Sequence, residues 1–289
     1  MPIDNIVLRP VEGPKEYHAA EAIQRAAWPS DDAIEVIPLA FMLTAQKNGG
    51  LVLGAFLEGE MIAFAFSILG RSPDKQWKHS SHMLAVLPQH RASGVGELLK
   101  WAQRDFVLQQ GLDLITWTVD PLEGPNASLN FGKLGVVCNR YLRNLYGDMQ
   151  DGLNLGLPSD RLEVDWQIGS PRVASFRKEP EKPRRTAEKD VAAAFALNAL
   201  DWNEKFPTPA EPILDADEPL LAISVPPSIQ AIKAHSMDLA AEWRLHTRSI
   251  FEAYFAAGYS ATDFLSRPTD LGRQNTYLIR RNGNGFHKN

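Results

Sequence analysis

Apolar residues in the first part of the chain recur in short runs separated by polar turns, a pattern typical of alternating strands and helices. The segment "NIVLRPV" predicts a strand, and "PKEYHAAEAIQRAAW" predicts a helix with a proline well placed for its first turn. A second helix is expected at about residues 37–46. The runs "LVLGAFLEGE" and "MIAFAFSILG" predict two strands joined tightly through "EGE", which indicates a hairpin.

The pattern continues to about residue 168. "HSSHMLAVLP" predicts a fourth strand, and a long amphipathic helix follows that Gly111 should end. "DLITWTVDP" predicts a buried strand, and "NASLNFGKLG" predicts a short helix that Asn126 should cap and Gly135 should end. "LEVDWQI" is a late strand. The predicted order is β-α-α-β-β-β-α-β-α-β, a mixed α/β arrangement.

A second region follows a change of composition. "FRKEPEKPRRTAEKD" predicts a solvated linker, and "VAAAFALNALDW" predicts a short helix before a proline-rich passage. A smaller β-α-β-β unit then comprises "LLAISVP", "DLAAEWRLHTRSIFEAYFAAG", "YSATDFL" and "NTYLIRR". We expect Glu242, Arg244 and Arg248 to form a solvated face of its long helix. The predicted domains are therefore 1–170, a linker at 171–217 and 218–289.

Composition and charge exclude several classes of protein. The 289 residues are 44% hydrophobic and 22% charged, and the net charge is −5 at pH 7, so neither nucleic acid nor an anionic membrane is an expected partner. No apolar run approaches the roughly 20 residues of a membrane span, and the N-terminus lacks a signal pattern. Because Cys138 is the single cysteine, no internal disulfide can form; it is expected to be a small strand hydrophobe, and a cytoplasmic location is expected.

No metal site is expected. The seven histidines are scattered without the spacing of metal ligands: His18, His79, His82, His90, His235, His246 and His287.

Two glycines stand where the fourth strand turns into a helix, in "VLPQHRASGVGELLKWA", residues 86–102. Glycine costs conformational entropy, so Gly94 and Gly96 indicate a requirement for bare backbone. The start of a helix presents unpaired N–H groups and the positive end of the helix dipole. The stretch therefore predicts an anion-binding turn.

This stretch resembles the signature of the GCN5-related N-acetyltransferase (GNAT) superfamily, in which Arg/Gln-x-x-Gly-x-Gly/Ala follows the fourth strand. Val86, Pro88 and the residues from Arg91 to Gly96 match it, and Asn126, Leu134 and Gly135 match a second family signature downstream. The resemblance covers residues 6–168 and implies the GNAT fold with splayed central strands. It also implies an acyl-coenzyme A site at Leu84, Val86, Arg91, Ala92, Ser93, Gly94, Val95, Gly96 and Asn126.

Acyl transfer from a thioester to an amine needs an oxyanion donor, a base and an acid. The family implies a main-chain N–H of the fourth strand as the donor, here of Leu84, Ala85 or Val86. As the acid, Tyr146 matches the family position better than Tyr141. The candidate bases are Asp120 first and His82 second, with Glu123 close behind Asp120, and water-relayed deprotonation remains open.

More narrowly, "SHMLAVLPQHR", "DPLEGPNASLNFGKLG" and "LPSDRLEVDW" are similar to a GNAT group with an added C-terminal region. Some members are associated with N-acylamino-acid metabolism and use succinyl-CoA. The expected donor is thus acetyl-CoA or another acyl-CoA such as succinyl-CoA. The expected acceptor is a small-molecule amine, plausibly an amino acid whose carboxylate is bound by Arg140, Arg143 or Arg161.

Two other interpretations stay open. The chain could be a non-catalytic acyl-CoA-binding or regulatory module, because the base is uncertain. The C-terminal unit could serve interaction or homodimerisation. It could also be a degenerate GNAT half, because residues 84–119 and 223–264 both contain a strand, a Trp-bearing helix, a glycine and a strand; coincidence explains this equally well.

Overall fold

The computed structural model describes residues 5–28, 36–147, 149, 155–202, 206–270 and 272–281, which belong to two compact units. Unit 1 comprises Met1–Trp117, Gln150–Leu153 and Gln167–Gly169. Unit 2 comprises Thr118–Met149, Asn154–Trp166 and Ser170–Asn289. The chain passes from unit 1 to unit 2 within strand β5 (Leu114–Val119).

Unit 1 is built on antiparallel strands with one parallel addition. In sheet order its strands are β1 (Ile6–Pro10), β2 (Leu51–Leu57), β3 (Glu60–Arg71), β4 (Trp77–Val86) and β5. The β2–β3 hairpin turns at Glu58 and Gly59, whose φ angles of 52° and 86° are both positive. Such a turn matches the right-handed twist of the strands, and the predicted hairpin is confirmed.

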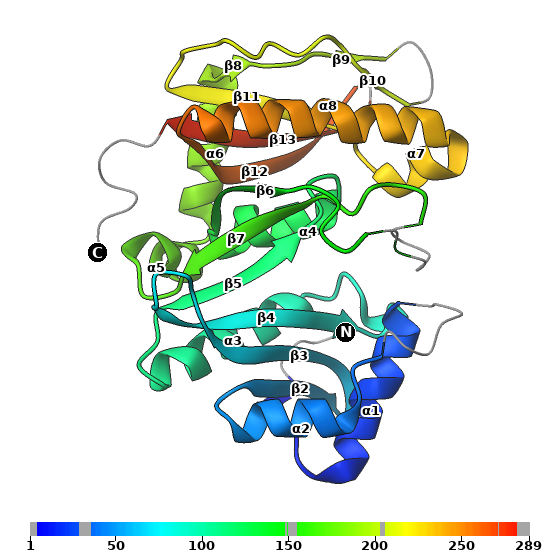
Figure 1. Ribbon diagram of the computed structural model, residues 1–289, viewed down its shortest axis with the longest axis vertical. Coiled ribbons are helices and arrows are strands. Elements are labelled where there is room, and N and C mark those ends of the chain that lie inside the picture. The colour runs from blue at the N-terminus through cyan, green and yellow to red at the C-terminus, as the bar shows by residue number, and fades with distance from the viewer. Residues whose placement is uncertain are drawn as a thin grey trace. The chain divides into compact units, whose positions relative to one another are not determined.

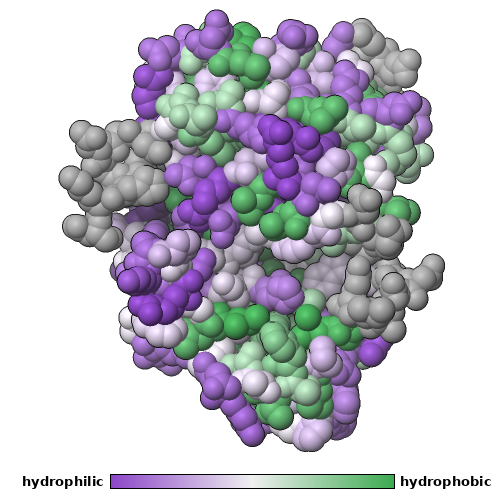
Figure 2. All heavy atoms as spheres, viewed as in Figure 1, coloured by the Kyte–Doolittle hydropathy of each residue, from purple (hydrophilic) through white to green (hydrophobic). Residues whose placement is uncertain are grey.

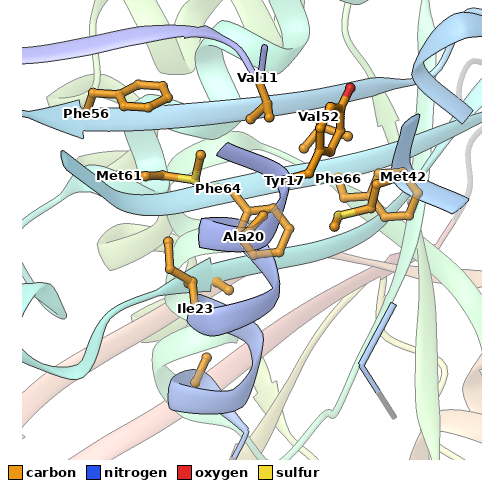
Figure 3. Close-up of a cluster of buried hydrophobic side chains, with 12 residues drawn as sticks. Val11, Tyr17, Ala20, Ile23, Met42, Val52, Phe56, Met61, Phe64 and Phe66 are labelled. Atoms are coloured by element: carbon orange, nitrogen blue, oxygen red, sulfur yellow. The ribbon is translucent and has the colours of Figure 1, made fainter. Parts of the chain in front are cut away.

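Helices cover both faces of these strands. Helices α1 (Gly13–Ala27) and α2 (Leu39–Lys47) lie on one face, and α3 (Val95–Gln109) lies on the other (Figure 1). Phe64 and Phe66 of β3 pack toward α1 in the cluster drawn in Figure 3, whereas the alternate residues Ala63 and Ala65 pack with the cluster that includes Leu99 of α3. Burial on both faces explains why these strands are continuous apolar runs.

Strands β4 and β5 separate soon after they meet. Their paired residues are His79 with Ile115 and Ser80 with Thr116, and the pairing between them ends there. A β-bulge shifts the register of β4 against β3 between Met83 and Ser81. We call this divergence of β4 and β5 the fork. It confirms the predicted splaying of the central strands.

Unit 2 contains its own run of paired strands. In order these are β7 (Arg161–Gln167), β6 (Val137–Leu142), β12 (Tyr259–Thr269), β13 (Gly272–Arg281), β11 (Leu220–Val225) and β8 (Phe195–Ala196). Tyr277 of β13 contacts Phe251 of helix α8 (Met237–Ala256), and the next residue, Leu278, contacts Ala187 of helix α6 (Glu181–Ala193). The two helices therefore pack on opposite faces of these strands (Figure 1).

The remaining elements are short. They are η3 (Pro88–His90), α4 (Gly124–Leu129), the π-helical turn η4 (Asn130–Leu134), α5 (Pro171–Lys178), β9 (Leu200–Asp201), β10 (Thr208–Pro209) and α7 (Ile229–His235). Gly135 ends η4 with a φ of 72°, as predicted, but the N-cap of α4 is Glu123 and not Asn126.

Several sequence predictions between residues 130 and 202 are wrong. The stretch predicted as a solvated linker forms α5 and α6, and the predicted helix after it instead completes α6 and supplies β8 and β9. Strand β6 is missing from the predicted order of elements, although Cys138 was expected to be a strand residue and is indeed buried in β6. Ala187, the buried residue of α6, packs on Ala222 and Leu278, so contacts distant in sequence stabilise a helix whose other positions are mostly polar.

The C-terminal strands continue the pairing that β6 and β7 begin, because Ala261 of β12 pairs with Cys138 of β6. The compact units thus do not follow the boundaries at residues 170 and 218, which remain predictions about domains. The half-repeat also stays a prediction. Strand β4 pairs directly with β5, whereas β13 lies between β11 and β12.

Across the ranges that the structure describes, none of the helices is long and apolar enough to cross a membrane. On the face seen in Figure 2, hydrophobic residues form several separate groups among hydrophilic ones.

Candidate functional site

The loop between β4 and α3 turns sharply through positive φ angles. Ala92 has a φ of 59° and Gly94 a φ of 89°, and the Ser93 hydroxyl donates a hydrogen bond of 2.6 Å to the His90 carbonyl. Gly94 is the N-cap of α3 and offers no side-chain cap, while Val95 is buried and anchors the first turn. The first backbone N–H groups of α3 are therefore presented as an anion-binding terminus.

Gly96 is not required by packing within the chain. A Cβ built on it would lie 3.6 Å from Leu84 Cδ2 and 3.9 Å from Val86 Cγ2, which are ordinary van der Waals distances. Packing within the chain therefore does not account for a glycine at this position. The exposed Arg91 is turned toward the end of α1, where its guanidinium donates to the Ala27 carbonyl at 3.0 Å.

The direction of the β4 backbone distinguishes the candidate oxyanion donors. The Leu87 N–H donates to the Ile62 carbonyl at 3.0 Å and so faces β3. N–H groups alternate in direction along a strand, so the N–H of Ala85 also faces β3. Those of Leu84 and Val86 face the open side of the fork. The geometry therefore favours Leu84 and Val86 over Ala85.

His82 lies at the bulge of β4. The residue is exposed, its ring meets the Phe66 ring edge-on at 6.0 Å, and desolvation lowers its pKa below the ordinary 6.5. At neutral pH the imidazole is thus uncharged and able to accept a proton. His79, by contrast, is buried between Ser67 and Gln110, with hydrogen bonds of 2.8 and 2.7 Å.

Asp120, the first candidate base, is held in an ion pair. Both carboxylate oxygens accept from Arg244, at 2.9 and 2.5 Å, and Oδ1 also accepts from the Leu122 N–H at 2.8 Å. Arg161 lies 3.5 Å from Oδ2. The Arg244 side chain is only 3% exposed. Both oxygens of Asp120 are thus held by arginines of the chain, and its role as a base stays a prediction.

Glu123 follows closely and differs from Asp120. Burial raises the pKa of its carboxyl group, and Gln230 donates to its Oε1 at 2.5 Å.

The two tyrosines occupy different environments. The Tyr141 hydroxyl donates to Asp160 at 2.7 Å, its ring stacks on Phe251, and burial raises its pKa. Tyr146 is 52% exposed, and its hydroxyl lies 2.9 Å from Thr118 Oγ1. Of the two hydroxyl groups, that of Tyr146 is the more accessible; the choice of Tyr146 as the acid stays a prediction.

The three predicted carboxylate-binding arginines are not equivalent. Arg140 bonds to Glu163 and Asp165 at 2.8 and 2.6 Å, and Arg143 makes two bonds of 2.5 Å to Glu252. These carboxylates of the chain itself already occupy both guanidinium groups. Arg161 is engaged as well: it is buried, donates to the Asp160 carbonyl at 2.9 Å and lies 3.5 Å from Asp120 Oδ2, and it differs from the other two in lying 5.4 Å from the centre of the Tyr146 ring.

Two arginines of α8 were wrongly predicted to be solvated. Arg244 binds Asp120, and Arg248 binds both oxygens of the buried Asp160 at 2.8 and 2.9 Å. These bonds lower the pKa of Asp160. The spacing of these residues in the sequence could have indicated that they are not solvated, because residues 244 and 248 share a helix face with the buried Phe251.

The remaining predictions concern a metal site and Asn126. The described residues contain no group of three His, Cys, Asp or Glu side chains able to hold a metal ion, and His287 lies outside them. Asn126 is exposed in the first turn of α4. An open surface hollow is lined by α5–α6 residues such as Glu181, Arg185 and Lys189 and includes no predicted site residue.

Residues 16–135 match the family model described as acetyltransferase (GNAT) family. The match contains the loop before α3 and ends at Gly135. No curated protein matches the chain.

Solved structures resemble part of the chain at low identity. The ribosomal-protein-S18-alanine N-acetyltransferase of Escherichia coli is 19% identical, covers 57% of this chain and 95% of its own, and has a TM-score of 0.42. A GNAT acetyltransferase of Streptococcus pneumoniae is 16% identical over 57% of this chain and 99% of its own, with a TM-score of 0.46. An N-acetyltransferase of Staphylococcus aureus Mu50 is 16% identical with the same coverage and a TM-score of 0.44.

The pairing of Asp120 leads to a prediction about stability. Replacing Asp120 with Asn should lower the free energy of unfolding by about 3–5 kcal/mol, because Arg244 would remain as a buried charge without its counter-ion. Urea denaturation followed by circular dichroism measures the change. The control is Glu252→Gln, which breaks an exposed pair with Arg143 and should change stability little. A D120N protein that is as stable as wild type but inactive would restore Asp120 as a catalytic base.

Proposed function

Because residues 16–135 form a domain of the acetyltransferase (GNAT) family, we propose that this protein is an acyl-CoA-dependent N-acyltransferase. The observation that carries the proposal is the loop before α3 together with the open edge of β4. The start of α3, which can bind an anion, and the N–H groups of Leu84 and Val86, which face the fork, belong to consecutive elements of unit 1.

The residues of unit 1 fit the chemistry of a coenzyme A thioester. The N–H groups at the start of α3 would bind the pyrophosphate, with Gly94 providing the left-handed turn and Gly96 the close approach. The N–H of Leu84 or Val86 would donate to the thioester oxygen as negative charge develops on it. The pantetheine arm, which joins the pyrophosphate to the thioester, must then run along the edge of β4 that faces the fork.

The proton transfers are assigned by exposure and hydrogen bonding. His82, uncharged at neutral pH, is the better candidate base now that Asp120 is seen in its ion pair; relay through water is the alternative. Tyr146 would donate a proton to the leaving thiolate, since its side chain is exposed and its hydroxyl group carries a proton that can be transferred.

Acetyl-CoA is the proposed donor, with succinyl-CoA as the alternative, and an amino acid is the proposed acceptor. Arg161 is the proposed partner of the acceptor carboxylate because it lies beside the proposed acid, and it would exchange its contacts with Asp120 and the Asp160 carbonyl for that carboxylate.

A second candidate function is a non-catalytic acyl-CoA-binding module, favoured by the engagement of Asp120 with Arg244. Such a module would bind acetyl-CoA but release no free CoA with any amine.

The phosphate-binding role of the loop is tested at Gly96. Gly96→Asp should weaken acetyl-CoA binding by at least about tenfold, because it places a negative charge where the N–H groups meet the pyrophosphate. Gly96→Ala is the matched control: its methyl group fits without strain, so the fold should persist and binding should fall less. Isothermal titration measures both. Equal affinity of G96D and wild type would refute the assignment.

The acid is tested by a pair of conservative changes. Tyr146→Phe should lower kcat by about 10²-fold or more and leave acetyl-CoA affinity nearly unchanged, because the lost interaction forms only in the transition state. Tyr141→Phe should instead lower stability through the loss of its bond to Asp160 and have the smaller effect on kcat. The reverse result would transfer the role to Tyr141.

The acceptor is tested with pairs of substrates. An amino acid should be acylated faster than the amine obtained by removing its carboxylate, for example phenylalanine against phenethylamine. Arg161→Gln should raise KM mainly for the amino acid, because a charge-assisted bond is lost. Release of free CoA is the measurement. Equal turnover of both members of each pair argues for a polyamine or a protein N-terminus.

A further inference from the structure

A lysine amino group is buried at the vertex of the fork. Lys100 lies on α3, its residue is only 3% exposed, and its Nζ donates to Ser81 Oγ at 3.0 Å and to Gln103 Oε1 at 2.8 Å. The same nitrogen lies 3.6 Å from the centre of the Trp117 ring. All four residues belong to unit 1.

The partners of Lys100 identify its place in the fork. Ser81 directly follows Ser80, the last residue of β4 that pairs with β5, and Trp117 directly follows Thr116, the last paired residue of β5. A continued parallel ladder would bring these two positions side by side. The Lys100 amino group contacts both, so it lies where the two strands begin to diverge.

Stability does not explain this choice of residue. Burial of an ammonium group is costly, and desolvation lowers the pKa of Lys100 well below its usual 10.5. A methionine would fill a similar volume without that cost. It could not, however, donate hydrogen bonds to Ser81 and Gln103. With lysine, one amino group both donates a hydrogen bond to Ser81 of β4 and contacts the Trp117 ring of β5.

We propose that Lys100 is a positioning residue that holds β4 and β5 apart at the correct width for the pantetheine arm of an acyl-CoA. The inference rests on the proposed function, because it concerns the space between β4 and β5 in which the acyl-CoA is proposed to bind. Lys100 acts through the two strands and does not itself take part in the acyl transfer. It determines whether the N–H groups of Leu84 and Val86 can reach the thioester.

The chain contains a matched control residue. Lys78 also links the two strands, since its Nζ donates to Thr116 Oγ1 at 2.8 Å. It does so where β4 and β5 are still paired, beside Ser80 and Thr116. Loss of Lys78 therefore removes a lysine between the same strands without touching the vertex of the fork.

The test compares two ligands that occupy different parts of the cleft. Acetyl-CoA needs the anion-binding loop and the fork, whereas 3′-phosphoadenosine 5′-diphosphate carries the pyrophosphate but lacks the pantetheine arm. Titration calorimetry on the full chain should show that Lys100→Met weakens acetyl-CoA binding by about tenfold or more. Binding of the nucleotide should stay within about twofold of wild type, and Lys78→Met should alter neither.

The possible results separate the inference from the proposed function. If wild type fails to bind acetyl-CoA, the proposed function itself is wrong. If wild type binds acetyl-CoA and K100M binds it equally well, or loses both ligands alike while still folded, the positioning role is wrong. Should K100M fail to fold, Ser81→Ala replaces it, since that change removes one anchor of the amine. S81A should weaken acetyl-CoA binding selectively, and its binding both ligands as wild type does would equally overturn the inference.

Discussion

The divergence of β4 from β5 after Ser80 and Thr116 is the constraint on which the site in unit 1 depends. A strand that loses its neighbour keeps backbone N–H groups that need a new partner. Those of Leu84 and Val86 face the side that β5 has left, and the bulge at His82 sets their direction. Interrupted pairing thus leaves backbone donors along the open edge of β4. The anion-binding loop begins where the same strand ends.

Unit 2 contains carboxylates that are largely buried and therefore need charged partners. Asp120 and Asp160 are each bound by an arginine of α8 through two hydrogen bonds. Asp160 also accepts bonds from the Tyr141 hydroxyl and from the Asn144 N–H. Satisfied in this way, Asp120 fixes the turn between β5 and α4, and Asp160 fixes the turn after β6, in which Tyr146 lies. The C-terminal helix therefore contributes directly to the geometry around the proposed acid.

Local signals made part of this structure predictable. The left-handed φ of Gly94 and the helix that follows it are encoded within a few residues, as are the hairpin at Glu58–Gly59 and the stop at Gly135. The ion pair of Arg244 with Asp120 joins residues 124 positions apart, so no local sequence pattern predicts it. Helix periodicity identified the apolar face of α8 but could not show that two arginines share it. Helix α6 was missed for the same reason, since its buried contacts come from β11 and β13.

Helix α3 connects the two ends of the proposed cleft. Gly96 and Lys100 are four residues apart and so lie on one face of the helix, separated by about 6 Å along its axis. At Gly96 that face approaches Leu84 and Val86, and at Lys100 it reaches Ser81, so α3 and β4 run in opposite directions beside each other. The helix whose first N–H groups are proposed to bind the pyrophosphate also carries the amine at the vertex of the fork. A rigid α-helix keeps these two points at a fixed separation. Only the second of these points holds the two strands, because the Lys100 amino group contacts both Ser81 of β4 and Trp117 of β5, whereas the start of α3 lies beyond the end of β4.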